Sequence, residues 1–378
     1  MKPFRSSTQR ALFFFSIILV LTSCKKNLNL TEENNSFFPM ASMTDTITTE
    51  PAEQYNNLFT RYGGGWTGGD GVYSIPMGNN RTIWTFGDTF LDTVYPDRSR
   101  PGSPLVRNTF AIQKKNKFKT LYQGSASEPI AMVETEDPEN EWYWPLDGIV
   151  YDDILYVFMA YFVRTGTGMW DFHYERTDRV SFSLPDFNEI DRVTVWDEPN
   201  IAFGAAIMEE DDFIYIYSTE EVPLTKRSHV ARVPADNFLA EWEFFDGEGW
   251  TTAFPGSDGW MKKGSADLFY LDVSNQFSVF YHNGFYRLVT QEGFLGPDIH
   301  TYLSEAPYGP WQYKQKLYTT PETGGDVFTY NALMHPEIKH PTTNAMLMSY
   351  CVNSQNFWDL FSNADIYRPY FVWVNYPE

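Results

Sequence analysis

The chain has 378 residues and a formal net charge of −21, with 49 Asp and Glu against 28 Lys and Arg. This acidic balance argues against nucleic acid or an anionic lipid surface as a partner, because both repel negative charge. Aromatic residues make up 18% of the chain, which favours an all-β protein and is compatible with carbohydrate binding, since sugar rings stack on aromatic faces.

The N-terminus predicts a lipoprotein signal peptide over residues 1–23. A basic region, an apolar core and a cleavage site follow one another, at Lys2, Arg5 and Arg10, at residues 11–21 and at Leu21-Thr22-Ser23-Cys24. The last four residues resemble the lipobox of bacterial lipoproteins, in which the Cys becomes the acylated first residue. The alternative is an ordinary secretory signal. We expect lipidation of Cys24 and a place in the bacterial cell envelope, periplasmic or at the outer-membrane surface.

Residues 24–54 are predicted to be a flexible tether between the lipid and the folded domain. They are polar, rich in Asn, Thr, Glu and Ser, and show no sustained periodicity. No other stretch approaches the roughly 18 apolar residues that span a bilayer. The mature protein would therefore be anchored to a membrane through its N-terminal lipid only.

A β-hairpin is predicted next, with two aspartates opposite each other. Residues 72–77 and 81–86 are rich in β-branched and aromatic residues, and Gly78-Asn79-Asn80 between them is typical of a turn with positive φ. If the pairing is symmetric about Asn79, Asp70 lies opposite Asp88, with Cβ atoms roughly 4.5–5.5 Å apart.

Like charges in such a position destabilise a sheet, so the aspartate pair needs an explanation. A shared proton, a cation or a catalytic site would each supply one. The alternative is that each Asp ends a strand and bonds local backbone through an Asx-turn.

Pairs of strands then recur along the chain. The second strand of each pair contains an aromatic residue or Met at Trp84, Tyr156, Tyr215, Tyr286 and Met348, a mean spacing of 66 residues. Five such units without a long amphipathic helix predict a five-bladed β-propeller over residues 55–378. A two-sheet sandwich is the structural alternative.

The segment Trp142-Tyr143-Trp144-Pro145-Leu146-Asp147-Gly148 places an acid among aromatic residues. A sugar subsite needs ring faces for stacking and a carboxyl whose pKa burial can raise. We therefore expect Trp142 and Trp144, with Trp66 beside the hairpin, to bind substrate. The alternative for Asp147 is a turn residue before Gly.

His335 is a candidate ligand for a sugar or a cation, although a lone His is more often a satisfied structural residue. The chain has no Cys and His cluster at zinc spacing, no Gly-x-Ser-x-Gly elbow and no phosphate-binding Gly loop. The sequence specifies no cofactor, and a structural cation in the propeller channel stays open.

Five segments occur in an order that resembles bacterial five-bladed propellers of the family called domain of unknown function 4185. They are Gly69–Ser74, Phe86–Phe90, Val230–Pro234, Ser304–Trp311 and Tyr330–Glu337. These proteins are similar in architecture to arabinanases, levansucrases and other propeller glycosidases, and the resemblance covers about residues 58 to 375.

The resemblance implies that carboxylates near the start of each blade's inner strand form the site. By position these starts are Asp70, Asp147, Gly204, Gln276 and Asn331. Asp70 and Asp147 are then the first catalytic pair, with Asp88 as a modulator of the Asp70 pKa or a cation ligand. Gln276 and Asn331 would contact substrate.

The third blade departs from this pattern. In arabinanase-type propellers it supplies the general acid, and here it has Gly204, while Glu209 and Glu210 fall at a hairpin tip and are expected to be solvated. Either Asp88 substitutes as the acid, or the protein is not a glycosidase of that kind.

The sequence thus predicts a lipid-anchored glycoside hydrolase acting on a polysaccharide, arabinan-like by resemblance. The second hypothesis is a glycan-binding lipoprotein that captures sugar without cleaving it, and the third is a protein-interaction propeller. The sugar, the linkage and the oligomeric state stay open.

Overall fold

The computed structural model describes residues 46–168, 170–264, 269–293 and 295–377. The expected signal peptide, Cys24 and most of the expected tether lie outside these residues. Among the described residues, strands form seven sheets, of which five have four or more strands, and helices are few and short. The expectation of an all-β protein is confirmed.

Each of the five larger sheets is an antiparallel sheet built mainly from neighbouring strands. The first contains β3 (Tyr73–Pro76), β4 (Arg81–Phe86), β7 (Thr109–Lys114) and β8 (Lys117–Leu121). The second contains β11 (Glu141–Tyr151), β12 (Ile154–Arg164), β13 (Phe172–Ser183) and β14 (Glu189–Trp196). The third contains β15 (Ile201–Glu210), β16 (Phe213–Val222), β17 (Thr225–Arg227), β18 (Val230–Pro234), β19 (Glu243–Phe245) and β20 (Trp250–Thr251).

The last two larger sheets complete the set. The fourth contains β21 (Phe277–His282), β22 (Phe285–Gln291), β23 (Asp298–Ser304) and β24 (Gln312–Thr319). The fifth contains β25 (Val327–Lys339), β26 (Met346–Ser354), β27 (Pro369–Asn375) and β1 (Thr48–Pro51).

Short elements fill the connections. They are β2 (Trp66–Gly69), β5 (Thr89–Leu91) and β6 (Leu105–Val106), β9 (Gln123–Gly124) and β10 (Pro129–Ile130), the helices α1 (Glu53–Leu58) and α2 (Asp359–Ser362), and the 3-10 turns η2 (Gly256–Gly259) and η3 (Ala364–Ile366).

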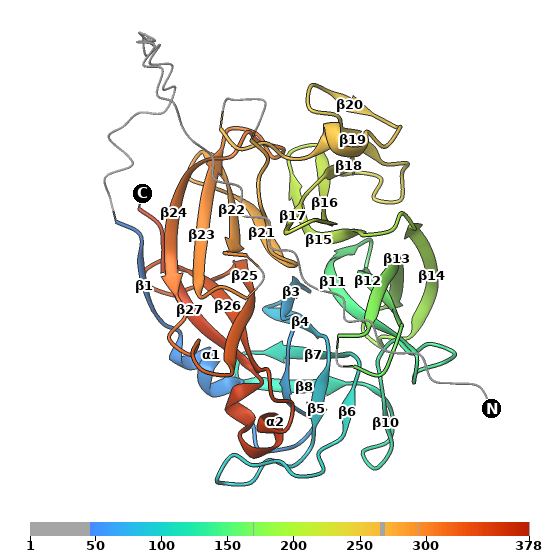
Figure 1. Ribbon diagram of the computed structural model, residues 1–378, viewed down its shortest axis with the longest axis vertical. Helices are drawn as coiled ribbons and strands as arrows, with labels where there is room; N and C mark the ends of the chain where they lie inside the picture. The colour runs from blue at the N-terminus through green and yellow to red at the C-terminus, as the bar shows by residue number, and fades with distance from the viewer. Residues whose placement is uncertain (1–45, 169, 265–268, 294, 378) are drawn as a thin grey trace, which may run out of the picture. The chain divides into compact units, whose positions relative to one another are not determined.

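One edge strand of each larger sheet lies nearest a common centre (Figure 1). These strands are β3, β11, β15, β21 and β25. Around the centre β3 contacts β11, β11 contacts β15, β15 contacts β21, β21 contacts β25, and β25 contacts β3. We call these five strands the inner strands. Five hydrophobic core clusters lie between successive sheets, each drawing residues from two neighbours. Apolar burial between sheets therefore holds the arrangement together.

The hairpin has the register predicted for it. Tyr73 pairs with Thr85 in β3 and β4, and Gly69 pairs with Thr89 in β2 and β5, so both ladders are symmetric about Asn79 where they flank the aspartates. Farther out, the register of β2 shifts between Trp66 and Gly68. Asn79 has φ of 53°, as the turn requires. Asp70 and Asp88 lie opposite each other in the gap between the two ladders.

Three inner strands carry bulges that the sequence did not reveal. The register shifts between Pro145 and Gly148 in β11, between Phe203 and Ala206 in β15, and between Tyr330 and Leu333 in β25. Asp147, Gly204 and Asn331 therefore lie inside their strands, at the bulges, and not at the strand starts expected of them. A bulge adds a residue, which breaks the alternation that marks a strand in sequence.

The fifth sheet joins residues from both ends of the described chain. β1 pairs with β27, from Thr48 opposite Asn375 to Pro51 opposite Val372. The fold therefore begins before the expected boundary at residue 55, within the segment predicted as tether. Next to β1, α1 packs Tyr55 against Trp373, with ring centroids 5.7 Å apart.

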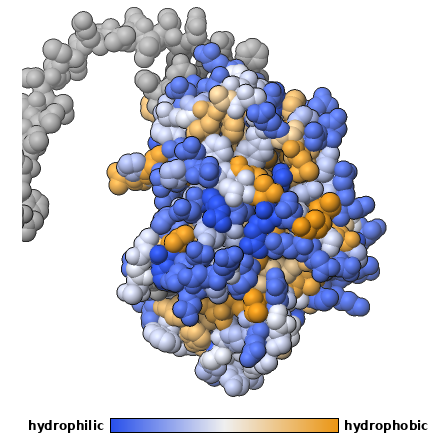
Figure 2. Space-filling model, turned by 90° about the vertical axis from the view of Figure 1, so that its right-hand side faces the viewer, coloured by the Kyte–Doolittle hydropathy of each residue, from blue (hydrophilic) through white to orange (hydrophobic). Residues whose placement is uncertain are grey.

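The surface is mixed in character. On the face turned to the viewer in Figure 2, hydrophilic residues dominate and hydrophobic ones are scattered among them. None of the helices in the described ranges has the length and apolar character needed to cross a membrane.

The contribution of β1 can be tested by truncation. A chain starting at residue 53 loses the ladder between β1 and β27, whereas one starting at residue 46 keeps every described residue. We expect the shorter chain to lose about 2 kcal/mol of unfolding free energy, because several backbone hydrogen bonds disappear and β27 becomes an edge. Urea denaturation measures the difference, and equal midpoints for the two chains would contradict the role given to β1.

Candidate functional site

Five carboxyl groups with raised pKa values belong to inner strands or the loops beside them. Glu210 lies at the hairpin tip of β15, and the other four are Asp70, Asp88, Asp147 and Glu337. The pKa values of Asp70, Asp147 and Glu337 rise to about 7, mainly because protein surrounds these carboxyls and disfavours their charge. The pKa of Asp88 is also raised by burial. All four nevertheless keep some solvent exposure. A carboxyl that is crowded by protein yet reached by solvent is a candidate for chemistry.

Asp70 lies just before β3. Tyr330 of β25 donates a hydrogen bond from its hydroxyl to Asp70 Oδ2 at 2.6 Å. Burial and the neighbouring charge of Asp88 raise the Asp70 pKa. The Asp70 carboxyl lies close to the backbone of Gly87. A Cβ at position 87 would lie 2.5 Å from Asp70 Oδ1, so a larger residue there would displace the carboxyl. Near neutral pH Asp70 is therefore a half-protonated acid.

Asp88 has a different environment. Arg107 pairs with it, with 3.2 Å between Nη1 and Oδ2, and the indole N–H of Trp144 donates to Oδ1 at 2.9 Å. Burial raises the Asp88 pKa, while the Arg107 charge and the Trp144 hydrogen bond oppose that rise. The two aspartates thus have different partners: a phenol at Asp70 and a cation at Asp88.

Two tyrosines hold the aspartate pair, Tyr330 from β25 and Tyr367 from the end of η3, just before β27. Tyr367 donates from its hydroxyl to the Asp88 backbone carbonyl at 3.2 Å. Asn353 donates to the Tyr330 hydroxyl at 3.2 Å, which orients it toward Asp70. The pKa values of both phenols are raised well above their usual range by burial and by the carboxyls beside them, so they stay protonated donors.

Asp147 joins two inner strands. One carboxylate oxygen accepts the backbone N–H of Gly148 and the other that of Ile207 in β15, both at 2.8 Å. β11 and β15 are edge strands of their sheets, which leaves N–H groups along them without a strand partner. With both oxygens engaged, Asp147 is better placed to position β15 than to exchange a proton with substrate.

Glu337 ends a chain of hydrogen bonds. The Ser74 hydroxyl donates to Glu337 Oε1 at 2.5 Å and lies 2.6 Å from His335 Nδ1, while His335 Nε2 lies 2.9 Å from the Ser349 hydroxyl. If Ser74 gives its proton to Glu337, His335 Nδ1–H donates to Ser74 and Nε2 accepts from Ser349. Burial lowers the pKa of His335 to about 3, so its ring is neutral.

Three of the expected substrate contacts are buried side chains. His335 and Trp66 are fully buried, and Trp142 is 2% exposed. Trp66 packs against Phe59 and Phe86 in the core, so neither of its faces is open to a sugar. Alternating aromatic residues predict a strand but not which face of it meets solvent.

The other expected contacts lie closer to the site. Trp144 is half-buried and bonded to Asp88, and Gln276 lies beside Gly71, 3.4 Å from where a Cβ would stand. Asn331 and Gln276 are each 8% exposed, which leaves little of either side chain for a ligand.

Several site residues were not singled out from the sequence: Ser74, Arg107, Tyr330, Glu337 and Tyr367. Glu337 follows His335 by two residues, a spacing that places both on one face of a strand, and this signal could have found it. Tyr330 reaches Asp70 only because the fifth sheet packs against the first, and Tyr367 reaches Asp88 from the segment between η3 and β27.

The third sheet adds no acid at the equivalent bulge. Gly204 has φ of 102°, and a Cβ on it would lie 2.4 Å from the Phe158 side chain. Glu209 and Glu210 lie at the hairpin tip between β15 and β16, as expected. No larger side chain fits at Gly204 without displacing Phe158.

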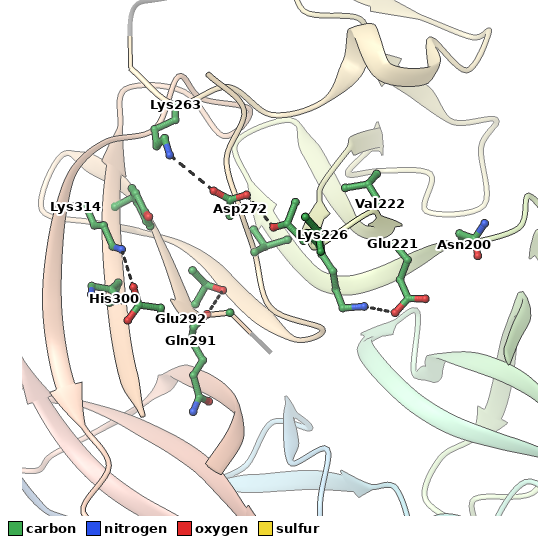
Figure 3. Close-up of a pocket in the computed structure, with 16 residues that line it drawn as sticks. Asn200, Glu221, Val222, Lys226, Lys263, Asp272, Gln291, Glu292, His300 and Lys314 are labelled. Carbon is green, nitrogen blue, oxygen red and sulfur yellow. Dashed lines mark hydrogen bonds and ion pairs between the residues drawn. The ribbon is translucent and has the colours of Figure 1, made fainter. Parts of the chain in front are cut away.

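A separate pocket of about 770 Å³ lies beside the third and fourth sheets (Figure 3). Its acidic residues are paired with lysines: Glu221 with Lys226, Asp272 with Lys263 and Glu292 with Lys314. Glu292, Asp298 and His300 cluster at its edge, where Lys316 also pairs with Asp298. None of the five carboxyls with raised pKa lines this pocket, so size alone does not identify the site.

A family profile described as "Domain of unknown function (DUF5005)" matches residues 52–376. The expected resemblance to domain of unknown function 4185 is not confirmed by this match. No curated protein matches the sequence.

A solved structure shares the fold. A provisionally named hydrolase from Bacteroides ovatus ATCC 8483 is 22% identical and has a TM-score of 0.72, over 87% of this chain and 90% of that one. A GH43_1 enzyme from Xanthomonas citri complexed with xylotriose is 12% identical, with a TM-score of 0.44 over 86% and 90% of the two chains. An endo-1,4-beta-xylanase from Bacteroides thetaiotaomicron VPI-5482 is 15% identical, with a TM-score of 0.44 over 81% and 89%.

Asp70→Asn tests the strain in the aspartate pair. The folded pKa of Asp70, about 7, exceeds the value of about 3.9 in an unfolded chain, so ionisation destabilises the fold as the pH rises from 4 to 7. We expect the variant to gain about 1–2 kcal/mol of unfolding free energy at pH 8, after allowance for solvent screening, and little at pH 4.

Urea denaturation at both pH values measures this effect. Asp246→Asn is the matched control, because hydrogen bonds from Gly249 and Glu248 lower the pKa of that exposed carboxyl, and its loss stabilises nothing. A loss of stability in Asp70→Asn at pH 8 would show that the Asp70 carboxylate is a structural ligand.

Proposed function

The chain belongs to the DUF5005 family, whose function is unknown, and from its site we propose that it is a glycoside hydrolase acting on a polysaccharide. The observation that carries the proposal is the pair Asp70 and Asp88, two neighbouring carboxyls with different partners. Asp70 accepts a hydrogen bond from a phenol, and Asp88 pairs with an arginine. Glycosidases use one carboxyl as an acid and another as a base or nucleophile, kept apart in pKa by their surroundings.

The roles follow from the partners of each carboxyl. Asp70, with its pKa near 7 and the Tyr330 phenol beside it, holds a proton at neutral pH and gives it to the glycosidic oxygen. Asp88, beside Arg107 and the Trp144 indole, is the carboxylate that activates water or attacks the sugar. Because the two groups interact, they titrate as one pair that shares a proton.

The proposed architecture is a five-bladed β-propeller. Each of the five larger sheets would be a blade, with an inner strand at the axis and a core cluster against the next blade. The pairing of β1 with β27 would close the ring, since the fifth blade then takes its outer strand from the start of the domain.

The alternative proposal is a protein that binds glycan without cleaving it. One observation favours it: the bulge in β15 has Gly204 packed on Phe158, so the third sheet supplies no acid there. On this alternative Asp70 and Asp88 would hydrogen-bond sugar hydroxyls.

Cleavage is tested on a panel of arabinan, xylan and β-1,3-galactan. We expect Asp70→Asn and Asp88→Asn each to lower kcat/KM at least about a hundredfold while the protein stays folded, because each removes an acid or base. Wild-type activity should also fall above pH 7 as Asp70 loses its proton. Asp246→Asn is the control that keeps full activity.

The outcomes separate the two proposals. Glycan retention in affinity gels without any released sugar would favour the binding protein. If the wild-type protein neither retains nor cleaves any glycan of the panel, both proposals are contradicted.

We also propose that Cys24 carries a lipid that anchors the protein in the bacterial cell envelope. The supporting evidence is the sequence of residues 1–24, with its basic region, apolar core and lipobox-like ending. Its acidic charge gives the mature chain no attraction of its own to an anionic membrane.

Cys24→Ala tests the anchor. We expect the variant to leave the membrane fraction or to remain unprocessed, because the acylated side chain is gone. Cell fractionation and mass spectrometry of the N-terminus measure this. Membrane association of Cys24→Ala equal to that of the wild type would overturn the proposal, and Cys351→Ala, a change at a buried thiol, is the control.

A further inference from the structure

A row of aromatic side chains leads from the aspartate pair to the surface along the second sheet. Trp144 donates to Asp88 and also lies close to Asp70, since a Cβ on Gly87 would be 3.4 Å from Trp144 and 2.5 Å from Asp70. One ring therefore borders both carboxyls.

The row continues through Phe172 to Trp170. The ring centroids of Trp144 and Phe172 lie 5.2 Å apart, and those of Phe172 and Trp170 lie 6.4 Å apart. Exposure increases outward: Trp144 and Phe172 are half-buried, whereas Trp170 is 58% exposed. Phe172 begins β13, and Trp170 lies in the turn between β12 and β13.

The row rests on a fixed base. Arg107, the partner of Asp88, stacks over the buried ring of Trp142 at 4.3 Å, and Arg164 lies over the same ring at 5.4 Å. Trp142 in turn contacts Trp144 and Phe172, with centroids 5.7 and 5.5 Å away. One set of contacts thus fixes both the carboxylate and the rings beside it.

Trp170, which is more than half exposed, leaves an aromatic surface open to solvent at the end of this row. The ring planes of Trp144 and Phe172 are nearly perpendicular, at 88°, and those of Phe172 and Trp170 are inclined by 39°. The row therefore offers an aromatic edge or face at each step, which the apolar C–H groups of successive sugars can contact. A single terminal sugar would need only Trp144.

We infer that Trp144, Phe172 and Trp170 form an extended subsite that holds a glycan chain of several sugar units running outward from Asp70 and Asp88. This inference rests on the proposed function, because it assumes that the aspartate pair meets carbohydrate. Such a subsite makes the protein selective for a glycan polymer, which it binds along the polymer chain, over a short oligosaccharide.

The test compares Trp170→Ala with the wild type on arabino-, xylo- and β-1,3-galacto-oligosaccharides of increasing length. Kd comes from calorimetry, and KM from sugar release where the protein cleaves. We expect wild-type affinity to rise with chain length, and Trp170→Ala to bind long chains roughly tenfold more weakly, the loss of one stacked ring. The shortest ligands should bind both proteins equally, and kcat should not change.

Trp358→Ala is the matched control, because Trp358 is also exposed, at 72%, but packs against Phe357 and Phe361 at α2, away from the row. It should bind all lengths as the wild type does. Phe172→Leu is a second variant that keeps an apolar side chain and should weaken long-chain binding as well.

Two results would overturn the inference in distinguishable ways. Equal length dependence in Trp170→Ala and the wild type, with sugar still bound, would remove the extended subsite and leave the proposed function standing. No binding or cleavage of any series by the wild type would remove the proposed function, and the subsite with it.

Discussion

The structure depends on one constraint: it has to hold the carboxyl groups of Asp70 and Asp88 next to each other although like charges repel. The hairpin around Asn79 brings Asp70 and Asp88 opposite each other, where two carboxylates repel strongly because little water separates them. The fifth sheet supplies the Tyr330 phenol for one, and Arg107 balances the charge of the other. The pair is therefore stable only when several sheets are in place around it, which ties the chemistry of the site to the assembly of the fold.

The fold was predictable where local sequence decides it. Turn residues of the hairpin require positive φ, and that fixes the register of both of its ladders. The second strands of the repeated pairs were also found, since alternating apolar residues mark them. The bulges were missed, because an extra residue such as Asp147 ends the visible alternation halfway along β11.

The site residues also fall into those that local sequence predicts and those that depend on packing between distant segments. Asp70 and Asp88 belong to one hairpin, so their pairing follows from counting residues about Asn79. Tyr330 lies 260 residues from Asp70, and only packing of the fifth sheet against the first brings them together. Burial has the same long-range origin: sequence suggested sugar-stacking roles for both Trp66 and Trp144, and the contacts of Phe59 with Trp66 decide that one is core.

The pairing of β1 with β27 affects the folding of the chain during synthesis as well as the stability of the finished fold. A ribosome synthesises Thr48 more than three hundred residues before its partner Asn375, so this strand waits unpaired while the first four sheets emerge. Until the last strand arrives, β26 has an open edge. Chaperones that shield extended segments would therefore be needed most in the interval before the final strand is complete.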